Sequence, residues 1–149
     1  MSTLNIVGAG HVGRTLGRLF AARGVFAVQD VRTRSLASAR AAVAFIGAGT
    51  PVDADMRPAD VWMLAVADDA IAGVAAALAQ ATPMAGATVF HCSGAKASGE
   101  LDALRRAGAV VASVHPVRSF ADPAAVAAAF DGTFCGVEEI GRASCRERV

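Results

Sequence analysis

The fold of this chain is decided by the stretch Leu4-Asn5-Ile6-Val7-Gly8-Ala9-Gly10-His11-Val12-Gly13. Its first four residues form a short apolar run, which is typical of a buried strand. Residues 12–23 then carry apolar side chains at helical spacing. The glycine pattern between them, G-x-G-x-x-G, is informative because it joins a strand to a helix. The stretch therefore predicts a strand–turn–helix unit.

Each glycine of this pattern has a physical role. Gly8 permits a tight turn, Gly10 lets a pyrophosphate approach the backbone, and Gly13 allows the helix to pack closely on the strand. Free N–H groups at the start of the helix, together with the helix dipole, attract phosphates. A glycine turn that binds nothing is the alternative. We expect a dinucleotide to be bound by the loop residues Gly8, Ala9, Gly10, His11, Val12 and Gly13.

Composition and charge exclude several classes of protein. The chain has 149 residues, 54% of them hydrophobic and 18% charged, which suits one folded domain with a core. A net charge of +1, without a Lys/Arg block before the last residues, argues against a nucleic-acid binder. No apolar run reaches the roughly 18 residues of a membrane span. We expect no signal peptide, because the first residues lead straight into a predicted strand, and the three cysteines lack metal-ligand spacing. We therefore expect a cytoplasmic protein without membrane contact or metal.

Predicted strands and helices alternate along the chain, which indicates an α/β fold. We expect a doubly wound, mostly parallel Rossmann sheet with helices on both faces. Gly24 should end the first helix, and Ser35 or Ser38 should cap the second. Asp68 or Asp69 should cap the third. The predicted strands are 4–7, 26–31, 61–66, 88–92, 109–114 and 133–137, with a further one near Pro51. The predicted helices are 12–23, 35–46, 69–80, 98–107 and 123–130, the last capped by Asp122.

The end of the second predicted strand bears on which cofactor is bound. An NAD site usually places an acid there, on the ribose 2′-hydroxyl. Asp30 is the nearest acid. The Arg34-Ser35 pair, which resembles an NADP motif, places the ribose position at Thr33. Because side chains alternate along a strand, Asp30 should face away from that position. Thr33, Arg34 and Ser35 could instead hold a 2′-phosphate, with Arg34 providing a charge-assisted contact. This pattern favours NADP over NAD, although a solvated turn and a helix cap are the alternative.

Three segments follow predicted strands at the edge where α/β sheets bind ligands. Ala67 and Asp68 follow the strand 61–66 and are expected to line the nicotinamide ribose. A cluster of polar side chains follows the next strand, and His115 follows the one after that and is a candidate proton donor or orienting group. Either histidine of these two later segments could instead be structural, and Cys92 is expected to be buried. The candidate catalytic residues are His91, Ser93, Lys96 and His115.

The last eleven residues, 139–149, match at every position the translation of a short-read sequencing adaptor. We interpret them as an artefact tail that should be left out of fold reasoning. The expected organisation is therefore an NADP-binding domain over residues 1–138 and a tail over 139–149. This interpretation also implies that the gene was cut short.

The motifs together resemble a bacterial family of Rossmann-like oxidoreductases with a C-terminal helical domain of unknown function, within the 6-phosphogluconate dehydrogenase-like superfamily. The resemblance covers residues 4–138. It implies a Rossmann domain, NADP as cofactor, a small-molecule substrate of unspecified identity, and a homodimer built by a helical domain that is missing here. The matching motifs are Gly8–Gly13, Arg34-Ser35, Val66–Ile71, His91–Ala95 and His115–Phe120.

Two functions follow from these expectations. The first is hydride transfer between NADP(H) and a small carbonyl, imine or hydroxyacid compound, with this chain as the cofactor-binding part of the enzyme. The second is a module that senses or binds NADP(H) without catalysis. The polar side chains at 91, 93 and 115 favour the enzyme, because a sensor needs only the glycine loop. Fold alone does not choose between the two.

Overall fold

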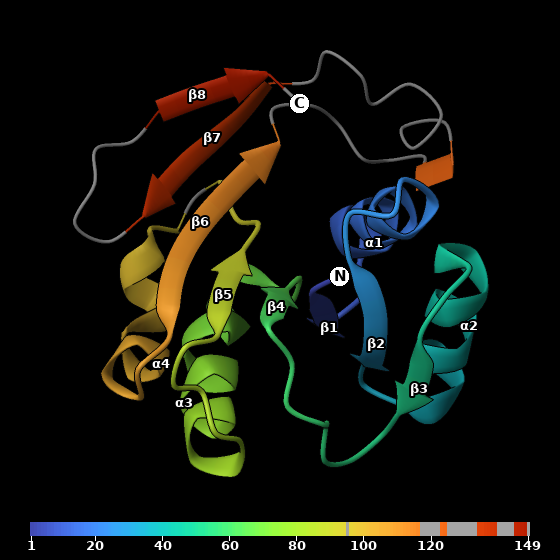
Figure 1. Cartoon of the computed structure of the whole chain (residues 1–149), viewed down its shortest axis with the longest axis horizontal. Helices are drawn as coiled ribbons and strands as arrows, with labels where there is room; N and C mark the ends of the chain where they lie inside the picture. The colour runs from blue at the N-terminus through green and yellow to red at the C-terminus, as the bar shows by residue number, and fades with distance from the viewer. Residues whose placement is uncertain (95, 117–122, 125–133, 140–144, 149) are drawn as a thin grey trace.

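One eight-stranded sheet organises the chain, in the order β3-β2-β1-β4-β5-β6-β7-β8 (Figure 1). The computed structural model describes residues 1–94, 96–116, 123–124, 134–139 and 145–148. The first six strands in this order are parallel, and β7 and β8 are antiparallel to their neighbours. The strands are β1 Thr3–Val7, β2 Ala27–Arg32, β3 Thr50–Val52, β4 Val61–Leu64, β5 Thr88–His91, β6 Val110–Pro116, β7 Phe134–Glu139 and β8 Cys145–Arg148.

Helices cover both faces of the parallel strands. Helices α1 (His11–Ala22) and α2 (Leu36–Ile46) lie beside β1, β2 and β3, and α3 (Ile71–Ala81) and α4 (Asp102–Arg106) lie beside β4, β5 and β6 (Figure 1). Two short 3-10 turns, Asp68–Ala70 and Ser98–Leu101, lead directly into α3 and α4. The architecture is the doubly wound α/β fold that the sequence predicts.

The alternation of side chains along the strands divides the core between the two faces. Leu4 and Ile6 of β1 pack with α1 and α2, whereas Val7 packs with α3 and α4. Neighbouring β4 repeats the pattern, because Met63 joins the first cluster and Trp62 and Leu64 join the second. All of these side chains except Val7 are completely buried, so the sheet is fixed from both sides at the strands that lead into the site.

Most local signals in the sequence are confirmed. Helix α1 ends at Ala22, and Gly24 follows it with a left-handed φ of +63°. At the start of α2, the Ser35 hydroxyl accepts a hydrogen bond from the N–H of Ser38. The expected cap on the third helix is wrong. Neither Asp68 nor Asp69 caps α3 with its side chain, because both lie in the 3-10 turn that precedes it.

The C-terminal expectations are tested only in part. The strand predicted over residues 133–137 is confirmed as β7, which ends two residues later at Glu139. Residues 145–148 of the expected artefact tail form β8 against β7, so the structure gives part of the tail a place at the edge of the sheet. The artefact interpretation itself stays a prediction. Of the predicted helix 123–130, only residues 123–124 lie within the described part, and Asp122 lies outside it.

Candidate functional site

The glycine turn after β1 is built against the end of β4. Gly8 has a φ of +81°, and a Cβ at this position would lie 2.6 Å from the carbonyl oxygen of Ala65. A Cβ on Gly13 would lie 2.5 Å from the Cβ of Ala65. The N–H of Gly8 also donates to the carbonyl of Arg32, 2.8 Å away. Glycine is therefore required at both positions, by backbone angle at Gly8 and by close packing at Gly13.

Helix α1 begins at this turn without a capping side chain. Gly10 is its N-cap residue, no side chain accepts from the first-turn N–H groups, and the first turn carries no acid. Among the described residues, apart from its chain neighbours and its own helix, the nearest atom to a Cβ added at Gly10 is the carbonyl oxygen of Ala65 at 4.0 Å, so the space beside it is open. Uncapped N–H groups, the positive end of the helix dipole and open space together suit an anion.

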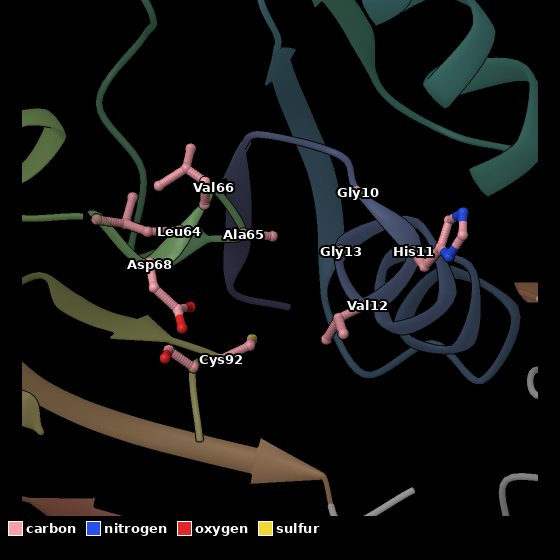
Figure 2. Close-up of a pocket in the computed structure, with 11 residues that line it drawn as sticks. Gly10, His11, Val12, Gly13, Leu64, Ala65, Val66, Asp68 and Cys92 are labelled. Carbon is pink, nitrogen blue, oxygen red and sulfur yellow. The ribbon is translucent and has the colours of Figure 1, made fainter. Parts of the chain in front are cut away.

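A cavity of about 330 Å³ lies beside the first turn of α1, which carries these N–H groups. In Figure 2, Val12 reaches toward it from α1, Asp68 and Cys92 approach it from the strand ends, and His11 points away. The cavity thus brings the glycine loop together with the ends of β4 and β5. The lining residues are Gly10, His11, Val12, Gly13, Leu64, Ala65, Val66, Ala67, Asp68, Cys92 and Ser93.

Several predicted site residues therefore meet at one place. Gly10 to Gly13, Ala67, Asp68 and Ser93 all line the cavity. Gly8 shapes the turn behind it, and the carbonyl of Ala9 accepts from the side chain of Arg14 at 3.2 Å. The sequence analysis missed the contributions of Leu64 and Ala65, whose apolar side chains carry no chemical signal, and named Val66 only as part of a motif.

The predicted phosphate-binding turn after β2 lies outside the residues that line this cavity. Thr33 donates its hydroxyl to the carbonyl of Ser35 at 3.0 Å, so it cannot donate to a ligand as well. Ser35 accepts from the N–H of Ser38 and keeps its own hydroxyl hydrogen for another acceptor. The Arg34 side chain is exposed and, within the described residues, has no ion-pair or hydrogen-bond partner.

Asp30, the acid near this turn, forms an ion pair with Arg57. It is 1% exposed, and its carboxylate accepts from the guanidinium of Arg57 at 2.6 Å and from the N–H of the same residue at 2.8 Å. Burial raises the pKa of Asp30, but the hydrogen bonds and charge of Arg57 outweigh burial and hold this pKa below its ordinary value. No local pattern in the sequence indicates this partner, which lies 27 residues further along the chain.

The end of β5 and the loop after it hold three of the four candidate catalytic residues, His91 in the strand and Ser93 and Lys96 in the loop. Ser93 is buried at the cavity wall, and its hydroxyl accepts from the N–H of Lys96 at 3.2 Å. His91 is fully buried and does not line the cavity, and both of its ring nitrogens make hydrogen bonds. The catalytic role of His91 stays a prediction; in this geometry the ring is buried away from the cavity and both of its nitrogens are engaged. Lys96 is half-buried and also lies outside the lining.

His115, near the end of β6, lies next to this loop. Its half-buried ring approaches Gly94 so closely that a Cβ at that position would meet the Nε2 atom at 2.6 Å. Gly94 directly follows Ser93, so His115 lies one residue from the cavity wall without lining the cavity itself. The adjoining residues 117–120 of the predicted segment lie outside the described part.

The described residues hold no group of three or more histidine, cysteine or acidic side chains placed to bind a metal. In the same part of the chain, none of the helices has both the length and the apolar character needed to cross a membrane.

The fold and the glycine turn define a class, the doubly wound α/β proteins with a glycine-rich turn between the first strand and the first helix. A family model for the Rossmann-like domain matches residues 2–116, and the chain belongs to that family. No curated protein matches the chain significantly.

Solved structures of oxidoreductases share this fold. A Bacteroides fragilis protein assigned as an NADP oxidoreductase is 19% identical with a TM-score of 0.65, covering 78% of this chain and 44% of its own. Pyrroline-5-carboxylate reductase from Coxiella burnetii is 21% identical with a TM-score of 0.64, covering 80% and 45%. Prephenate dehydrogenase from Aquifex aeolicus, in complex with NAD+ and hydroxyphenyl propionate, is 23% identical with a TM-score of 0.61, covering 78% and 42%.

These likenesses establish a shared fold, and the names of the structures include both NADP and NAD+. The chain spans less than half of the length of each of the three.

Proposed function

We propose that this chain binds NADP(H) as the cofactor-binding part of an oxidoreductase. The observation that carries the proposal is the uncapped start of α1, which opens onto a cavity lined by the ends of β4 and β5. Ligands of open α/β sheets bind at such a place, beyond the carboxyl ends of the strands. The family and the oxidoreductases that share its fold support the same function.

The residues at the site fit a dinucleotide. The N–H groups of the first turn of α1 would hold the pyrophosphate, since no side chain caps them and the space beside Gly10 is open. Asp68 lines the same cavity, and its carboxylate would accept hydrogen bonds from ribose hydroxyls. Ala67 would pack beside that ribose.

The end of β2 supports NADP over NAD. An acid that binds the ribose 2′-hydroxyl must have a free carboxylate, and the carboxylate of Asp30 is engaged by Arg57. Arg34 is an unpartnered cation in the described residues and would take the 2′-phosphate in a charge-assisted contact. Ser35 keeps a hydroxyl hydrogen for the same phosphate, whereas Thr33 would contribute only as an acceptor or by shape.

The nicotinamide supplies the hydride transfer, and the chain supplies binding and orientation. Ser93 lines the cavity and would orient a substrate carbonyl, imine or hydroxyl near the nicotinamide. We assign His115 and Lys96, from the neighbouring strand end and the same loop, to proton transfer or to charge near the substrate. The whole enzyme would be a cytoplasmic homodimer whose helical second domain completes the cleft.

Calorimetric titration of the 149-residue chain with NADPH and with NADH tests the proposal. We expect saturable binding with NADPH preferred. A chain that melts cooperatively yet binds neither cofactor would contradict it. Loss of NADPH absorbance in the presence of small carbonyl or imine compounds then tests for oxidoreductase activity. Binding without turnover in a longer form of the protein would favour a cofactor-sensing module.

A further inference from the structure

A single buried imidazole holds both ends of the loop between β5 and the Ser98–Leu101 turn. The Nδ1 atom of His91 lies 3.1 Å from the N–H nitrogen of Ser93, and its Nε2 atom lies 2.8 Å from the carbonyl oxygen of Ala97. The side chain is 0% exposed, so water does not compete for either nitrogen. The two contacts span the loop from its second to its sixth residue.

These two partners define the protonation state of the ring. Ser93 offers an N–H, so Nδ1 must accept and carries no proton. Ala97 offers a carbonyl oxygen, so Nε2 must carry the proton and donate it. His91 is therefore neutral and is the Nε2–H tautomer. A proton on Nδ1 would point at the N–H of Ser93 and break that contact.

Further hydrogen bonds complete the loop that His91 holds. The N–H of Lys96 donates to the Ser93 hydroxyl at 3.2 Å, and the Ser113 hydroxyl of β6 donates to the carbonyl of Lys96 at 3.4 Å. Ser93 lines the cavity, and the ring of His115 lies against the next residue, Gly94. A displacement of the loop would therefore move Ser93 and change the contact between Gly94 and His115. Ser93 and His115 are two of the three groups that we assign to the substrate.

We propose that His91 is a positioning residue, which in its neutral Nε2–H form fixes Ser93 at the wall of the cavity and, through Gly94, supports His115 beside that wall. The importance of this role rests on the proposed function, because that function assigns the cavity to a cofactor and its substrate. The hydrogen-bond role itself does not depend on any ligand.

The wild-type 149-residue chain provides the first test, by ¹⁵N NMR of the His91 ring and hydrogen exchange of backbone amides. We expect a protonated Nε2, an unprotonated Nδ1 and a slowly exchanging Ser93 amide. The amide of Val110, which donates to the carbonyl of Ala87 at 2.8 Å, serves as an internal reference for exchange. A proton on Nδ1, or a Ser93 amide that exchanges as fast as an unbonded one, would overturn the proposal.

Three variants separate the two contacts. His91→Asn keeps an acceptor near the place of Nδ1, His91→Gln keeps a donor near the place of Nε2, and His91→Phe keeps only a ring of similar shape. We expect Asn to preserve most of the exchange protection at Ser93 and Gln and Phe to lower it by about tenfold, the effect of losing one hydrogen bond. Equal protection in Asn, Gln and Phe would show that the ring only fills space.

These measurements stand apart from the cofactor proposal. If the chain binds no NADPH but shows the expected tautomer and exchange pattern, the proposed function fails and the positioning role survives. If NADPH binds but the tautomer is Nδ1–H, the positioning role fails and the proposed function survives. A thermal melt of each variant distinguishes a loop that has moved from a chain that has unfolded, and the wild-type tautomer tests the role even if the Phe variant fails to fold.

Discussion

The imidazole of His115 lies against the backbone of Gly94, so that a β-carbon on residue 94 would stand 2.6 Å from Nε2 and 2.7 Å from Cε1. The atoms in the way are at the far end of a side chain. A larger residue at this position could therefore be accommodated by turning the ring. Gly94 consequently sets where His115 lies without being needed for the fold.

Gly94→Ala should separate these two effects. We expect the free energy of unfolding to stay within about 1 kcal/mol of wild type, since a flexible ring can move, while the ring resonances of His115 shift. Gly99→Ala is the matched control, because a Cβ there meets no atom within 4 Å. It should leave the His115 resonances in place. Unchanged His115 resonances in Gly94→Ala would contradict the packing described above.

The two outer residues of the G-x-G motif should fail in different ways. Gly8→Ala puts a Cβ against the backbone of Ala65 at a φ of +81°, so we expect it to destabilise the fold by more than about 1–2 kcal/mol. Gly10→Ala has room within the protein but fills the space assigned to the pyrophosphate.

For Gly10→Ala we therefore expect a near-wild-type chemical denaturation midpoint and an NADPH affinity at least about tenfold weaker, or about 1.4 kcal/mol. Calorimetry and a denaturant titration on both variants measure the two quantities. A Gly10→Ala chain that binds NADPH as tightly as wild type would place the pyrophosphate elsewhere.

Arg34→Ala should change the choice of cofactor. A charge-assisted hydrogen bond contributes about 1.5–3 kcal/mol, so NADPH affinity should fall by roughly ten- to a hundredfold while NADH affinity changes little. Arg40→Ala, also an exposed arginine but within α2, should affect neither. Parallel titrations with both cofactors measure the difference, and equal losses for NADPH and NADH would remove Arg34 from a 2′-phosphate site.

The ion pair between Asp30 and Arg57 predicts a pH dependence of stability. Arg57 holds the pKa of Asp30 below its unfolded value of about 4, so the pair stabilises the fold above that pH. The contribution should be lost as the pH falls through the lower pKa of the folded state, because protonated Asp30 no longer attracts Arg57.

Asp30→Asn should thus be less stable than wild type near neutral pH, and the gap should narrow below about pH 4. Thermal melts of both proteins across this range provide the measurement. A constant gap down to the lowest pH that the fold survives would show that the carboxylate charge contributes nothing. The side chain of Arg57 is 61% exposed, so water screens its charge in this pair.

Local features were predictable from the sequence, and contacts between distant segments were not. The glycine turn, helix α1 and the Ser35 cap depend on neighbours within a few residues, so pattern and propensity identify them. The partners of Asp30 and His91 depend on how strands and loops meet in three dimensions. A carboxylate near the end of β2 looks the same in sequence whether it faces a ribose or a guanidinium.

The candidate site shows the same division. The glycine loop, Ala67, Asp68 and Ser93 were found because strand ends gather at one edge of a parallel sheet. The hydrogen-bond partners of His91 and the lining by Leu64 and Ala65 came only from the structure. Two histidines at comparable strand ends differ in burial, and burial depends on the packing of the loop above them.

The place of β1 in the sheet affects the order in which the chain can fold during synthesis. One side of β1 pairs with β2, which follows soon after it, but the other side pairs with β4, and the N–H of Thr3 bonds to Asp60, 57 residues later. Until the ribosome has released that much more chain, the apolar strand Leu4–Val7 has one unpaired edge. An unpaired strand edge can pair with another nascent chain. While roughly the first sixty residues are being synthesised, this protein is therefore exposed to aggregation and to binding by chaperones.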